Sequence, residues 1–124
     1  MKTVLKVIAL LVIFAGAATA LELNQSPAGP REWGYRPADG ARTDRSPPGF
    51  TWRPTRGATA YTLQVARDAD FQDVAYECEK TPWAAHCPTT TLEPGTYQWR
   101  YAAFDKNGNR TEWSKTRTFT VPED

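Results

Sequence analysis

Short runs of alternating apolar and polar residues, separated by glycine, proline or asparagine, recur along most of this chain of 124 residues. The clearest run covers residues 60–67, where Tyr61, Leu63 and Val65 alternate with polar or small residues. Positions two apart lie on the same face of a strand, so this run predicts a strand with one buried face. Further runs at 50–53, 74–79, 87–92, 97–103 and 115–121 predict short, regularly spaced strands, which are typical of an all-β sandwich or barrel.

The apolar positions of these runs predict the core. The residues expected there are Phe50, Trp52, Tyr61, Leu63, Val65, Tyr97, Trp99, Tyr101 and Phe119. The segment LEPGTYQW at 92–99 resembles a tyrosine corner, in which the tyrosine hydroxyl bonds back to nearby backbone in β-sandwiches. We therefore expect a fibronectin III or immunoglobulin-like β-sandwich of about seven strands.

The first twenty residues do not fit this pattern. Lys2 and Lys6 precede an apolar run at 7–18, and Ala18-Thr19-Ala20 matches a small-x-small cleavage site. These features predict a signal peptide at 1–20, removed on export. The run is shorter than the about 20 apolar residues that span a bilayer, so no membrane association is expected after cleavage. The rest reads as one domain: an extended lead-in at 21–46, with room for one short edge strand, and the sandwich at 47–124.

The charge of the exported chain is close to neutral. Without Lys2 and Lys6, 13 of the 15 basic residues remain against 14 acidic ones. A chain with this balance has no strong positive field to capture a polyanion over distance. We therefore expect no nucleic-acid partner.

Two cysteines, Cys78 and Cys87, are the candidate disulfide of an exported domain. Closing a loop of about ten residues would stabilise the fold by roughly 2–3 kcal/mol. Two free thiols, or metal ligation together with His86, are the alternatives. One histidine and two cysteines lack the fourth ligand of a structural zinc site, so no metal and no cofactor are expected.

Five tryptophans are present, and three of them fall outside the predicted strands. One of the three, Trp113 before Ser114, resembles a strand-edge packing motif. Trp33 and Trp83 lie in proline-flanked segments, whereas Trp52 and Trp99 have core-facing parity. Aromatic faces outside a core stack on sugars or pack at domain interfaces, although packing within the domain is the alternative. With Tyr35 and Arg36, whose guanidinium can pair with a carboxylate, they form the candidate glycan or domain-interface site.

Two motifs are the most specific: REWGYRP at 31–37 and PPGFTW at 47–52. With the segments at 61–68, 81–83, 92–101 and 107–114, they resemble the N-terminal fibronectin III-like domain of heparinase II/III-like (oligoalginate-lyase-like) polysaccharide lyases. In that family the catalytic residues lie in a later (α/α) toroid and further β-sheet domains, and we find no counterpart of them in this chain. No nucleophile–base pair or metal set is recognisable either, so we do not expect an enzyme.

The resemblance implies a non-catalytic accessory domain of a bacterial protein, periplasmic or extracellular. Its partner would be a lyase catalytic domain, in cis or from a neighbouring reading frame, with acidic polysaccharide as a candidate ligand. A standalone secreted β-sandwich that binds glycan or protein is the alternative.

Overall fold

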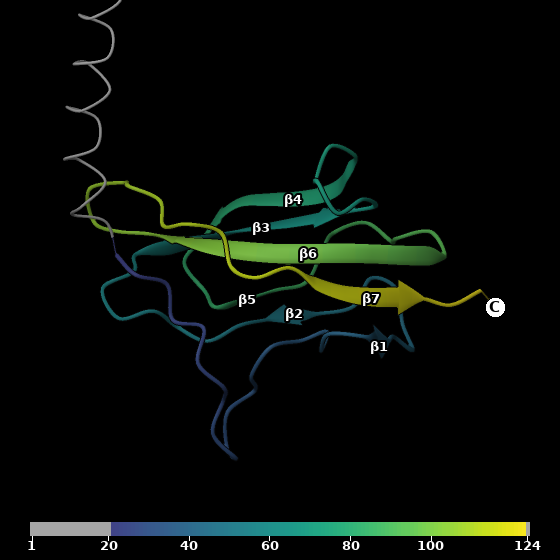
Figure 1. Cartoon of the computed structure of the whole chain (residues 1–124), viewed down its shortest axis with the longest axis horizontal. Helices are drawn as coiled ribbons and strands as arrows, with labels where there is room; N and C mark the ends of the chain where they lie inside the picture. The colour runs from purple at the N-terminus through teal and green to yellow at the C-terminus, as the bar shows by residue number, and fades with distance from the viewer. Residues whose placement is uncertain (1–20, 124) are drawn as a thin grey trace, which may run out of the picture.

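The computed structural model of the chain describes residues 21–123 (Figure 1). The predicted signal peptide lies outside these residues. Within them the structure is all-β, with no helix and seven strands in two sheets, consistent with a β-sandwich. The larger sheet has the order β1 (Ala41–Arg42), β7 (Arg117–Val121), β6 (Gly95–Phe104), β3 (Ala60–Ala66), β4 (Val74–Thr81). The smaller sheet pairs β2 (Phe50–Thr51) with β5 (Ala85–His86).

Strand β3 lies inside the larger sheet, between β6 and β4, and confirms the strand predicted from the alternation at 60–67. It pairs antiparallel with β4 on one side and with β6 on the other, with Leu63 opposite Tyr101 and Val65 opposite Trp99. Both neighbours shield it, so even polar Thr62 is buried, and its hydroxyl donates to the Cys78 carbonyl at 3.0 Å. The internal bond removes the penalty of burying that hydroxyl.

The core lies between the two sheets and is mainly aromatic. All nine residues expected there are buried, none with more than 5% of its surface exposed. Phe50 of β2 meets Trp99 edge-on at 5.4 Å between ring centroids, and meets Phe119 at 5.7 Å in the same manner. Edge-to-face aromatic pairs contribute about 0.5–1.5 kcal/mol each beyond the area they bury. Phe50 thereby joins the two sheets.

The tyrosine corner is also present. The Tyr97 hydroxyl donates to the Glu93 carbonyl at 2.6 Å, and its ring stacks on Phe119 at 5.5 Å. This bond ties the connection before β6 to the strand that follows it.

The strand expected to start at Cys87 does not form. Strand β5 ends one residue earlier, and Pro88 has no N–H to continue the ladder. Farther along, the Ser46 hydroxyl takes both backbone groups of Leu92: it accepts from the Leu92 N–H and donates to the Leu92 carbonyl, each at 2.8 Å. The segment is therefore held by a side chain and not by a neighbouring strand.

The short edge strand expected in the lead-in is β1. It runs parallel to β7, with Ala41 opposite Phe119. Backbone bonds on either side of it, from the Gly40 N–H to the Thr118 carbonyl and from the Thr43 N–H to the Thr120 carbonyl, extend the pairing. The lead-in thus becomes part of the larger sheet.

The strand predicted at 115–121 is β7, which starts only at Arg117. Before it, side-chain hydroxyls form hydrogen bonds to β6 that a neighbouring strand would otherwise form. The Thr111 hydroxyl accepts from the Ala103 N–H at 3.1 Å, and the Ser114 hydroxyl accepts from the Tyr101 N–H at 3.0 Å. The backbone N–H groups of Thr111 and Ser114 donate to the carbonyls of Ala103 and Tyr101, respectively, each at 2.8 Å. The second half of β6 is satisfied in this way without a regular strand beside it.

Candidate functional site

Two of the four residues predicted to form a site, Trp33 and Trp83, lie at the same groove. Each has 71% of its surface exposed, far more than the buried aromatic residues of the core. They line a groove of about 630 Å³, together with Trp52, Arg53 and Ala84 beneath or between them. Trp52 is buried, so its ring belongs both to the core and to the groove lining. We call this the tryptophan groove.

The two walls of the tryptophan groove come from segments far apart in sequence. Trp33 belongs to the lead-in before β1, and Trp83 lies in the connection from β4 to β5. The lead-in forms a loop that projects beyond the smaller sheet (Figure 1). The backbone N–H of Trp52 donates to the Ala84 carbonyl at 3.2 Å, and the Thr51 hydroxyl donates to the Gly34 carbonyl at 2.9 Å. These two bonds attach both walls to the chain around β2.

Gly34 is required by the conformation of the Trp33 loop. Its φ is +72°, a region that favours glycine, and a Cβ there would lie 3.1 Å from the Ala28 Cβ. The REWGYRP motif therefore needs glycine at its centre.

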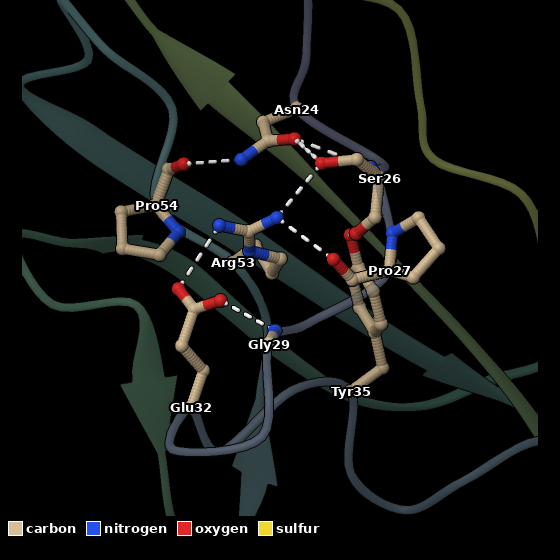
Figure 2. Close-up of polar contacts among 8 residues, drawn as sticks. All are labelled: Asn24, Ser26, Pro27, Gly29, Glu32, Tyr35, Arg53 and Pro54. Carbon is tan, nitrogen blue, oxygen red and sulfur yellow. Dashed lines mark hydrogen bonds and ion pairs between the residues drawn. The ribbon is translucent and has the colours of Figure 1, made fainter.

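Arg53 fixes the lead-in loop that carries Trp33 (Figure 2). Its Nη1 donates to the Ser26 hydroxyl at 2.8 Å and to the Pro27 carbonyl at 2.9 Å, and its Nη2 pairs with Glu32 Oε2 at 2.9 Å. The other carboxylate oxygen of Glu32 accepts from the Gly29 N–H. That backbone bond, followed by the charge of Arg53, lowers the pKa of Glu32. One arginine thus ties three points of the loop to the end of β2.

Two arginines lie beside Trp33. Arg31 is part of the groove lining, whereas the Arg36 guanidinium lies over the Trp33 ring, 4.9 Å from its centroid, and lines a neighbouring hollow and not the groove itself. Within residues 21–123 neither takes part in an ion pair, whereas Glu32 and Arg53 neutralise each other. Guanidinium groups bind carboxylates with two parallel bonds, and aromatic faces bind apolar surfaces. The groove is therefore suited to an acidic or mixed apolar–acidic ligand.

Tyr35 does not join Trp33 in the groove, contrary to expectation. Its ring lies over the guanidinium of Arg117, 3.9 Å away, and stacks on Tyr101 at 6.2 Å. Its hydroxyl donates to the Ser26 carbonyl at 2.7 Å. The backbone turn at Gly34 sends Trp33 and Tyr35 to different sides of the loop, so Tyr35 belongs to the domain's packing.

The expected disulfide is not formed in the structure. Cys78 is a half-buried free thiol on β4, and Cys87 is an exposed free thiol just after β5. Burial raises the pKa of the Cys78 thiol. Between β4 and β5 lies a different contact, in which His86 Nε2 and the Tyr76 hydroxyl are 2.6 Å apart and the rings stack at 5.7 Å. His86 is thus engaged with Tyr76, and its pKa is lowered by burial.

Arg53 and Arg117 were not singled out from the sequence. Their importance depends on partners 21–27 residues away for Arg53 and on the ring of Tyr35 for Arg117. No spacing pattern marks such contacts. In the described part of the chain, no group of three or more His, Cys, Asp or Glu residues is placed to hold a metal ion.

Comparison with protein-family models gave no match, and comparison with curated proteins gave none either. No helix that could cross a membrane occurs in residues 21–123.

Proposed function

We propose that this chain is a non-catalytic, fibronectin III-type accessory domain of an exported polysaccharide-lyase system of the heparinase II/III-like kind. Its tryptophan groove would pack against the lyase catalytic domain. The observation that carries the proposal is the pair of tryptophans, each 71% exposed, on a domain whose other aromatic side chains are buried or half-buried in the described residues. Exposed apolar patches on soluble domains mark interaction sites, and tryptophan and arginine are enriched at the energetic centres of interfaces.

Three features support the fibronectin III type. The larger sheet places β4, β3, β6 and β7 side by side, and the smaller sheet pairs β2 with β5. The tyrosine corner precedes β6, as in many sandwiches of this class. The REWGYRP loop, one of the two motifs with the most specific resemblance to the lyase domains, forms one wall of the groove.

A second candidate function is direct binding of an acidic polysaccharide in the same groove. It is favoured by Arg31 and Arg36, which have no ion-pair partner in the described residues and flank Trp33. A sugar ring would stack on an indole face while a carboxylate pairs with guanidinium.

Affinity measurements on matched variants test the first function. The chain is mixed with a heparinase II/III-like lyase catalytic domain, and binding is measured by calorimetry for wild type, Trp33→Ala, Trp83→Ala and Val74→Ala. Val74 is an exposed apolar residue on β4 outside the groove, so its variant is the control. Interface hot spots cost about 2 kcal/mol or more on truncation, which is at least about 30-fold in affinity.

Loss of affinity in the two tryptophan variants, with Val74→Ala unchanged, supports the interface. Equal affinity in all four proteins, or no binding of the lyase domain, rejects it. The second function is tested separately by titrating tryptophan fluorescence with alginate, heparin and neutral dextran. Saturable quenching by an acidic polymer that disappears in Trp33→Ala supports glycan binding, and no quenching rejects it.

A further inference from the structure

A second hollow lies on the side of the lead-in where Tyr35 packs. It has a volume of about 380 Å³ and is lined by Gln25, Tyr35, Asp39, Lys115 and Arg117 among others. Neither Trp33 nor Trp83 lines it. We call it the arginine pocket.

Arg117, the first residue of β7, is the unusual member of the arginine pocket. Only 4% of its surface is exposed, and its guanidinium lies between the rings of Tyr35, at 3.9 Å, and Trp99, at 5.6 Å. Its Nη1 is buried and has no hydrogen-bond partner in the described residues, and Arg117 forms no ion pair there. An arginine stays protonated in proteins, so this charge cannot be avoided by losing a proton.

A buried, unpaired charge is costly, and only part of the cost is offset here. The aromatic faces attract the cation, but they do not accept hydrogen bonds from the N–H groups, which point outward in the plane of the guanidinium. Burial lowers the pKa of Arg117, which reflects the lost hydration. The carboxylate of Asp39 also lines the pocket, yet it is too far for an ion pair, and its Oδ1 accepts from the Thr118 N–H at 2.8 Å. The guanidinium therefore lacks an acceptor.

We propose that the arginine pocket binds a small carboxylate anion, paired with Arg117 and attracted by Lys115 at the exposed side. A planar carboxylate matches the fork of a guanidinium better than a round anion does. The volume is near the low end of the about 300–1,000 Å³ that is usual for ligand sites. A ligand the size of a short organic acid or one acidic sugar unit is therefore expected.

Thermal unfolding of the full chain tests the proposal, because a ligand that binds only the folded state raises Tm by mass action. The probes are acetate and glucuronate at equal ionic strength, with glucose as the neutral control and sulfate as the tetrahedral anion. At concentrations about tenfold above Kd, a rise of about 5 °C or more is expected for a domain of this size. A rise with acetate indicates a general carboxylate site, and a rise with glucuronate alone indicates an acidic sugar; either supports the proposal.

Three variants separate binding from a structural role. Arg117→Met keeps an apolar chain between the rings and should lose the Tm rise. Arg100→Met is the matched control, because Arg100 also packs against an aromatic ring, that of Phe71 at 4.0 Å, but outside the pocket. It should keep the rise. Asp39→Asn removes the competing negative charge and retains an oxygen for the Thr118 N–H, so it should bind the carboxylate several-fold more tightly.

If Arg117→Met fails to fold, the tighter carboxylate binding expected of Asp39→Asn still tests the proposal. No Tm rise in wild type with either carboxylate, an equal rise in Arg117→Met, or an equally strong response to sulfate would each overturn the proposal.

Discussion

Replacing Arg53 by methionine should release the lead-in loop while leaving the core in place. The substitution removes two bonds from Nη1, of 2.8 and 2.9 Å, and the 2.9 Å pair with Glu32. The net contribution of each hydrogen bond to a neutral acceptor is about 1 kcal/mol, and the exposed pair with Glu32 adds little to it. The free energy of unfolding should therefore fall by about 2 kcal/mol.

The loss should be local as well as global. Urea unfolding followed by tryptophan fluorescence gives the change in free energy, and native-state hydrogen exchange locates it. In Arg53→Met the amides of Gly29 and Glu32, which are bonded to Glu32 Oε1 and to the Gly29 carbonyl, should exchange much faster. Amides of β3 and β6 should change only as far as the global stability does.

Arg31→Met is the matched control, because Arg31 is an exposed arginine of the same loop and forms no ion pair within residues 21–123. Its stability should stay within about 0.5 kcal/mol of wild type, as for most surface substitutions. If Arg53→Met is as stable as Arg31→Met and shows the same exchange at Gly29 and Glu32, Arg53 does not hold the loop.

Three further predictions concern other parts of the sandwich. Tyr97→Phe loses the hydroxyl bond to the carbonyl four residues earlier and should lower stability by about 0.5–1.5 kcal/mol, seen as a lower urea midpoint at unchanged slope. The pKa of Asp105 is lowered, first by the backbone N–H of Asn109, so its stabilising effect is complete above about pH 4 and is lost as pH falls through the folded pKa. Tm should therefore drop on acidification, and should drop less in Asp105→Asn. Burial raises the pKa of Cys78, so iodoacetamide at pH 8 should modify exposed Cys87 first, as peptide mass spectrometry would show.

The sequence predicted the strands whose side chains alternate and whose partners lie on both sides. Around Leu63 and Val65 apolar and polar residues alternate in the sequence, so the core-facing side followed directly from the pattern, although Thr62 and Ala66 on the other side are buried as well. The Pro-Gly pair before Tyr97 has a local chemical meaning, and its corner was predicted for the same reason. In both cases the information lies within a few neighbouring residues.

Long-range contacts could not be predicted in this way. The parallel pairing of β1 with β7 joins residues 78 positions apart, such as Ala41 and Phe119. The side of the loop on which Tyr35 packs depends on the turn at Gly34 and on the position of Arg117. In the candidate site the exposed tryptophans were predictable because proline-flanked segments stand outside strands. The arginine that holds their loop was not.

The two edges of the larger sheet bear on how the domain can meet other proteins. At one edge β1 is only two residues long, too short to template another strand. At the other, β4 carries the exposed charges of Glu77, Glu79 and Lys80, and its pairing with β3 contains two register shifts. Short, charged and irregular edges oppose strand addition. Copies of this domain that are crowded together would resist fusing edge to edge into a continuous sheet, and contacts would be made through side chains.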